Sequence, residues 1–197
     1  MNTETLISIL PILIAAAVVI AASLIAWFAI HRWRSHKLRE KFGPEYDYTL
    51  EKVGDRRAVE ETLQEREKRV NQLDIRTLKE DERVRYHDEW IEIQSKFVDN
   101  PSQSIEEANQ LITEVMIARG FPVADFEQRA ADLSVMYPDF VPNYRDAYSI
   151  AMRNRADGTS TEELRQAMVY YRSLFEELLG TMEDKNIEVK EKEAVAQ

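Results

Sequence analysis

The sequence predicts an all-α protein that consists of one N-terminal transmembrane helix, an amphipathic helical stalk and a small helical bundle. Residues 6–30 carry no charge. In the segments that follow, apolar residues recur three and four positions apart, as on one face of a helix, and no stretch alternates like a half-buried strand. The predicted regions are a short extracytoplasmic N-terminus (1–5), the transmembrane helix (6–30), a basic juxtamembrane segment (31–43), the stalk (44–73), the bundle (74–182) and a disordered charged tail (183–197).

Residues 6–30 are predicted to cross the membrane as one helix. These 25 residues, at about 1.5 Å each, span about 37 Å, which exceeds a hydrocarbon core of about 30 Å. A cleaved signal peptide would begin with basic residues and have a shorter apolar run, whereas this chain begins with Asn2, Thr3 and Glu4. We therefore expect an uncleaved anchor.

The residues that flank the span predict its orientation. Basic residues follow it directly and only Glu4 precedes it. The positive-inside rule therefore places the N-terminus outside and the C-terminal domain in the cytoplasm, at the inner (plasma) membrane. Because cysteine content does not fix the compartment, the reversed topology remains an alternative. Tryptophan and basic side chains favour the membrane interface, and the predicted interface residues are Trp27, Arg32, Trp33, Arg34, Lys37, Arg39 and Lys41.

Residues 44–73 have the sequence of a helical stalk with one bend. Gly43 and Pro44 separate it from the membrane helix, and Gly54 followed by Asp55 is typical of a helix stop and a new N-cap. The second part has a thin apolar seam at Val59, Leu63, Val70 and Leu73. This seam is too short to establish a coiled coil, so packing onto the bundle and pairing between two chains are both open. A homodimer could use the seam or the closely spaced small residues of the span, Ala17 with Ala21 and Ala22 with Ala26.

The bundle is predicted from apolar periodicity and helix-end signals. Ser160 and Glu163 have the spacing of a capping box, and Gly120 and Gly180 are suited to follow helix ends. We expect helices over about 79–98, 101–119, 125–135 and 142–155, and a final helix from Ser160 to Gly180.

Composition excludes several classes of function. The chain has 26 Lys and Arg against 36 Asp and Glu, a net charge of −10 and a pI near 4.9. Nucleic acids favour basic surfaces, so we expect no nucleic-acid partner. The absence of cysteine excludes disulfides, thiolate metal sites and thiol nucleophiles.

No motif predicts catalysis, a cofactor or a metal site. All five glycines fall at predicted helix ends, so no Gly-rich phosphate loop is expected. His87 has no histidine three or four positions away, and adjacent carboxylates such as Glu106 and Glu107 point to different helix faces. We therefore expect a protein that is not an enzyme.

The candidate interaction surface consists of arginine and tyrosine side chains. The arginines could pair with Asp125, Glu127, Asp132 or Asp139 between helices, or form a basic groove for an acidic peptide. The tyrosines fit core and rim positions first and an interaction surface second. The candidate residues are Arg129, Arg145, Arg165, Arg172, Tyr144 and Tyr170.

Several stretches resemble a family of uncharacterised bacterial proteins with a single N-terminal span and a cytoplasmic all-helical domain. They include Phe42-Gly43-Pro44-Glu45-Tyr46-Asp47, Phe97-Val98-Asp99-Asn100-Pro101, the segment 121–138 and Leu164-Arg165-Gln166-Ala167-Met168. The resemblance covers about residues 38–179 and implies the architecture and a bacterial source, without an activity, ligand or catalytic residue.

Together these observations predict a membrane-anchored, non-enzymatic module that binds another protein or organises an assembly. The alternative is a membrane-tethered sensor or enzyme with a ligand pocket between the bundle helices.

Overall fold

The computed structural model describes residue 20, residue 32 and residues 35–180. The predicted span 6–30 apart from Ile20, the interface residues Trp27, Trp33 and Arg34, and the tail 183–197 lie outside the described residues. Within the described part of the chain, none of the helices combines the length and the apolar character that crossing a membrane requires.

The described residues belong to two compact units, which divide between Lys41 and Phe42. In the first unit, residues 35–41 are helical, and Lys37, Arg39 and Lys41 are exposed on that helix. Arg32, the other described member of the predicted membrane-interface set, is also exposed.

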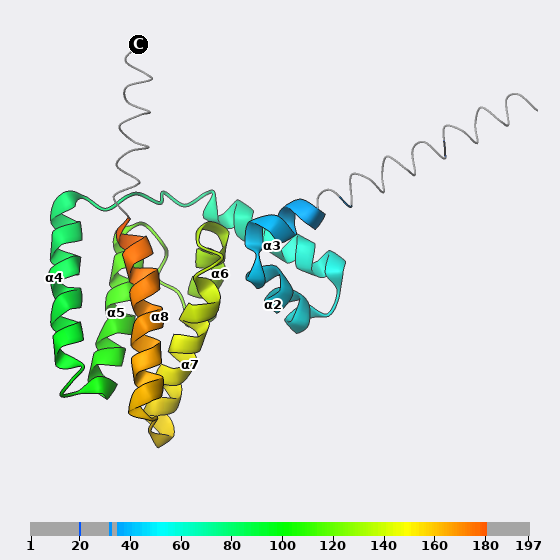
Figure 1. The fold of residues 1–197 in the computed structure, drawn as a ribbon. Coiled ribbons are helices and arrows are strands. Elements are labelled where there is room, and N and C mark those ends of the chain that lie inside the picture. The colour runs from blue at the N-terminus through cyan, green and yellow to red at the C-terminus, as the bar shows by residue number, and fades with distance from the viewer. Residues whose placement is uncertain (1–19, 21–31, 33–34, 181–197) are drawn as a thin grey trace, which may run out of the picture. The chain divides into compact units, whose positions relative to one another are not determined.

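The second unit is built from helices, and the described residues contain no strand (Figure 1). The all-α prediction is therefore confirmed for this part of the chain. The helices are α2 (Pro44–Val53), α3 (Arg56–Val70), α4 (Glu80–Lys96), α5 (Pro101–Ala118), α6 (Phe126–Met136), α7 (Val141–Asp157) and α8 (Thr161–Leu179).

The ends of these helices follow from local chemistry. Gly54 ends α2 in the left-handed conformation, with φ of 76°, and the side chain of Asp55 caps α3 by accepting from the Ala58 backbone N–H at 2.9 Å. Ser160 and Glu163 form the predicted capping box of α8. These signals act within a few residues of each other, which is why the sequence alone predicts them.

Helices α4, α5, α7 and α8 pack into a bundle around one apolar core (Figure 1). The ring of Trp90 on α4 stacks on Phe175 of α8 with 4.6 Å between centroids. Tyr144 of α7 meets Tyr171 of α8 edge-on, with both side chains fully buried. Among the described helices α4 packs chiefly against α5 and α8, and Val84 and Ile91 on its opposite side are exposed.

Helices α2 and α3 pack on each other, and they also contact α7 and α6, respectively. The seam residues Val59 and Leu63 are completely buried within the chain. Of the two roles that the sequence left open for this seam, the structure shows packing onto the domain. Residues 44–73 therefore lie in the same compact unit as the bundle helices, because apolar burial and ion pairs to α6 and α7 hold them there.

Candidate interaction surfaces

A buried carboxylate joins α2 to two other helices. The Glu45 side chain is 1% exposed, and its Oε1 accepts a hydrogen bond from Arg66 Nη1 of α3 at 2.8 Å and from Arg145 Nη2 of α7 at 3.1 Å. A carboxylate without such partners would be costly to bury. Glu45 therefore serves as a charged junction between α2, α3 and α7.

Arg145 extends this junction toward α6. Its Nη1 donates to Glu127 Oε2 at 3.0 Å, and Lys52 Nζ donates to the same oxygen at 3.2 Å. Arg145 and Lys52 also lie over the ring of Tyr48, at 4.2 and 4.7 Å from its centroid. We call Glu45, Tyr48, Lys52, Arg66, Glu127 and Arg145 the ionic junction.

The charges of the ionic junction shift the pKa values of Glu127 and Arg145 in the stabilising direction. Burial by itself raises the pKa of Glu127, but the hydrogen bond from Lys52 and the charge of Arg145 outweigh it, so the pKa lies below its ordinary value. Burial likewise lowers the pKa of Arg145, and the charge and hydrogen bond of Glu45 raise it above its ordinary value. Both groups are thus held in their charged forms.

A second ion pair connects α3 to α6. Asp132 is 1% exposed, and its Oδ1 accepts from Nε of Arg69 at 3.0 Å and from Nε2 of Gln128 at 2.9 Å. This pair and the ionic junction fix the position of α3 on the bundle.

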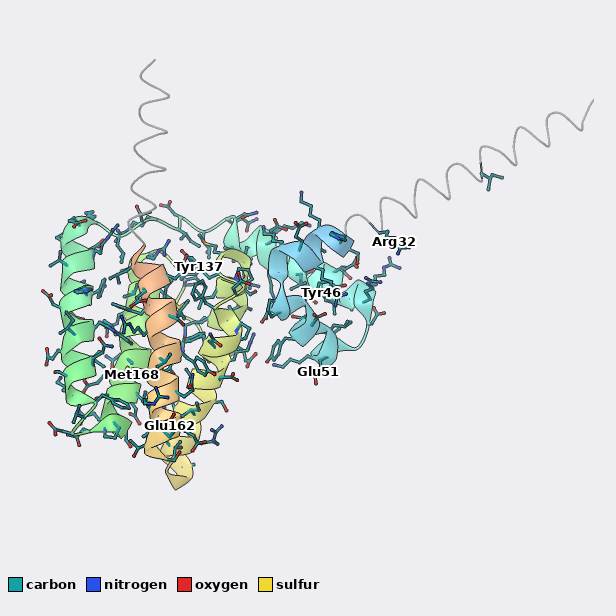
Figure 2. The ribbon with its side chains drawn as sticks, viewed as in Figure 1. Arg32, Tyr46, Glu51, Tyr137, Glu162 and Met168 are labelled. Atoms are coloured by element: carbon teal, nitrogen blue, oxygen red, sulfur yellow. The ribbon has the colours of Figure 1, made fainter. Side chains whose placement is uncertain are left out.

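The four predicted arginines do not form one groove. Arg145 belongs to the ionic junction, and Arg129 donates to the Ala124 carbonyl at 2.8 Å. Arg165 and Arg172 lie exposed on α8, where they pair with carboxylates of the same helix. Figure 2 shows Glu162, the partner of Arg165, near the start of α8.

The two predicted tyrosines differ in burial. Tyr144 is fully buried, and its hydroxyl accepts from Arg129 Nε at 3.4 Å. Tyr170 is half-buried and packs against the edge of the core. Tyr144 is thus a core residue.

Sequence reasoning missed the pair of Glu45 with Arg66. It expected Asp132 to form an ion pair but did not identify Arg69 as its partner. The one local signal was Arg66, which occupies an apolar position of the seam. An arginine there indicates a partner on another helix, but the sequence does not identify it as Glu45.

A different surface, along α4 and α5, is strongly acidic. A shallow groove of about 200 Å³ between these helices is lined by Glu89, Glu92, Glu107 and Glu114 together with Lys96. Lys96 bridges Glu92 and Glu107 at 2.8 and 3.5 Å. The acidic surface continues from the groove onto the outer side of α4, through Glu80, Asp81 and Asp88.

Exposed apolar side chains accompany these carboxylates. Val84 and Ile91 on α4 are 52% and 51% exposed, and Ile117 on α5 is 43% exposed. Val84 and Ile91 are two helical turns apart on the side of α4 opposite Tyr86 and Trp90. We call the combined surface the α4–α5 face; it consists of Glu80, Asp81, Val84, Arg85, Asp88, Glu89, Ile91, Glu92, Lys96, Glu107, Gln110, Glu114 and Ile117.

A third feature is a polar groove of about 360 Å³ between α3 and α6. Its lining includes Arg66, Arg69 and Glu127, whose charges already pair within the protein. The lining also contains the carboxylates of Glu65 and Asp125, so the groove presents ion-paired side chains beside two further acidic ones.

Within the described residues, no group of three or more histidine, aspartate and glutamate side chains is arranged to hold a metal ion. Comparison of the chain with protein-family models, curated proteins and solved structures found no significant match.

Proposed function

We propose that this protein is a membrane-anchored, non-enzymatic interaction or scaffold module at the bacterial inner membrane, with residues 42–180 in the cytoplasm. The anchor is inferred from the uncharged residues 6–30 and the basic residues that follow them. The bacterial source rests on the family resemblance. The interaction role rests chiefly on the α4–α5 face, which combines exposed apolar side chains with a dense set of carboxylates.

The distribution of polar groups supports a binding role. The most deeply buried charges, Glu45 and Asp132, are hydrogen-bonded to arginines of other helices, which is a structural use of charge. By contrast, Val84 and Ile91 of the α4–α5 face are exposed to solvent, although they are apolar and do not contribute to the core. Clusters of exposed apolar side chains rimmed by polar ones are typical of protein-binding surfaces.

The α3–α6 groove is the feature that favours the second candidate, a membrane-tethered ligand sensor. Its volume, about 360 Å³, falls within the range of small-molecule sites, about 300–1,000 Å³. A sensor of this kind would bind a small polar molecule beside Arg69 and Gln128.

In-cell crosslinking followed by mass spectrometry tests the interaction role. The full chain would be compared with a variant that lacks residues 1–41 and with a third chain in which an unrelated single-span anchor replaces them. We expect a reproducible partner with both anchored chains and a loss of most of it without an anchor. Recovery of no partner from any of the three chains would contradict the proposal and turn attention to the α3–α6 groove.

A further inference from the structure

We propose that the α4–α5 face binds a basic amphipathic helix of a partner protein, which lies along α4 with its apolar side on Val84 and Ile91 and its lysines or arginines on the surrounding carboxylates. This inference rests on the proposed interaction role and specifies the surface and the chemistry of the partner.

The negative charge of the face favours a positively charged partner. Its seven carboxylates stand against two basic side chains, Arg85 and Lys96. Lys96 is engaged by Glu92 and Glu107, and the Arg85 guanidinium lies 4.5 Å from the centroid of the Tyr86 ring. A basic partner would therefore meet an excess of negative charge along the whole of α4, which favours encounter and orientation.

The spacing of the exposed apolar side chains favours a partner segment that is α-helical. Val84 and Ile91 lie seven residues apart, which places them about 10 Å from each other along one side of α4. An amphipathic helix repeats its apolar residues at i, i+3, i+4 and i+7, so it can contact both side chains at once. Ile117, one turn beyond Glu114 on α5, is a further exposed apolar side chain of the face.

Charge also argues against two other occupants. Residues 42–180 carry 18 Lys and Arg against 29 Asp and Glu, so the corresponding unit of a second copy would be repelled. The anionic cytoplasmic leaflet would be repelled for the same reason. A basic segment from a different protein fits the face better than either.

A binding titration tests the chemistry. The full chain in nanodiscs of zwitterionic lipid would be titrated against a fluorescent amphipathic peptide of leucine and lysine, about four turns long, with fluorescence anisotropy as the readout. A peptide with glutamate in place of lysine serves as the ligand control. We expect binding of the lysine peptide that weakens with salt and no binding of the glutamate peptide.

Two matched pairs of variants locate the binding. The double variant Val84→Ser with Ile91→Ser should lower the affinity for the lysine peptide by about tenfold or more. Its control, Val98→Ser with Val123→Ser, changes two other exposed valines and should alter the affinity by less than about twofold. The charge reversal Asp88→Lys with Glu92→Lys should lower the affinity for the lysine peptide to a similar extent. Glu162→Lys with Glu176→Lys makes the same change of charge on α8 and should have a much smaller effect on that affinity. Equal effects of the two charge reversals, or no effect of the two serine substitutions on α4, would overturn the proposal. A thermal melt of each variant confirms that it is folded.

In-cell photo-crosslinking separates this inference from the proposed function. A photo-reactive residue would replace Ile91 in the full chain, with Val98 as the control position. The inference predicts crosslinks from position 91 to a segment of another protein that is basic and has apolar residues at helical spacing. Crosslinks to residues 31–41 of a second copy, or to a segment without that pattern, would overturn it. If chemical crosslinking captures a partner that position 91 does not reach, the interaction role stands and the assignment of the face is wrong.

Discussion

Arg145 on α7 donates a hydrogen bond to Glu45 on α2 at 3.1 Å, across 100 residues of sequence. Arg66 donates to the same carboxylate oxygen, so one buried acceptor serves two guanidinium groups. As a consequence α2, which follows the helical residues 35–41 in the chain, is fixed to the bundle through charge as well as through apolar contacts.

Glu45→Gln should therefore destabilise the second unit by about 3 kcal/mol, because it leaves two largely buried guanidinium groups without their shared counter-charge. Glu51→Gln is the matched control, since Glu51 lies exposed on the same helix (Figure 2), and it should change stability by less than about 0.5 kcal/mol. Chemical denaturation of both variants measures the difference. An equal and small effect of the two substitutions would show that Glu45 does not hold α2 in place.

The free energy of unfolding at acidic pH should depend on Glu82. The Arg76 guanidinium, which donates two hydrogen bonds of 2.7 Å, and the Lys79 backbone N–H lower the pKa of Glu82 from 4.5 to about 2. A lowered pKa in the folded state contributes stability above the unfolded pKa and loses it as pH falls through the folded one. The stability difference between the native chain and Glu82→Gln should thus be constant above about pH 5 and shrink toward pH 2. Carboxyl ¹³C shifts across the titration measure the Glu82 pKa directly, and a midpoint near 4.5 would contradict the assignment.

Gly120→Ala should be much more damaging than Gly54→Ala. Both glycines have positive φ, 101° and 76°, so alanine is strained at either position by about 1 kcal/mol or more. At position 120 the added Cβ would also collide with the backbone carbonyl of Asp74, whereas at position 54 it would meet no atom within 4 Å. We expect the first variant to lose at least about 2 kcal/mol, measured by thermal unfolding. A similar loss in both variants would show that the backbone at Gly120 does not approach the backbone at Asp74 closely.

The buried tyrosines should titrate only when the fold opens at alkaline pH. Burial is the main cause that raises the pKa of Tyr171 and of Tyr144. Because the folded pKa exceeds the unfolded one, this contribution to stability is complete below about pH 10 and is lost above it. Tyr171→Phe should be neutral or stabilising by up to about 1 kcal/mol in neutral solution, since the hydroxyl is buried without a hydrogen-bond partner in the described part of the structure.

The same variant should also unfold at higher pH than the native chain. Tyrosinate absorbance near 295 nm, followed together with circular dichroism, measures the ionisation and the unfolding in one titration. Ionisation of all eight tyrosines before any loss of helix would contradict the burial of Tyr144 and Tyr171.

Helix ends were predictable from the sequence because their causes are local. Gly54 with Asp55, and Ser160 with Glu163, act over a few residues, and the structure has the predicted stop, cap and capping box at these positions. The helix expected over about 79–98 likewise corresponds to α4, in which Tyr86 and Trp90 are buried together one turn apart. These features need no knowledge of the tertiary arrangement.

The ionic junction was predictable only in part because its members are far apart in sequence. Pairing of Arg145 with Glu127 was among the expected ion pairs, and the structure contains it. Glu45 resembles any acidic residue in the first turn of a helix, and only the packing of α2 against α7 reveals its role. The α4–α5 face was missed for a related reason, since periodicity identifies the buried side of α4 but not which of its other sides is left uncovered.

Cysteine accessibility tests the central claim, membrane anchoring with a cytoplasmic domain, most directly. The chain has no native cysteine, so single substitutions Asn2→Cys and Ser102→Cys report one site each; Ser102 is exposed at the start of α5. In spheroplasts of a bacterial host, we predict that a membrane-impermeant maleimide labels position 2 at once and position 102 only after permeabilisation, and that both variants stay in the membrane fraction after alkaline extraction. Labelling of position 102 in intact spheroplasts would reverse the topology, and release of the protein by alkali would contradict the anchor itself.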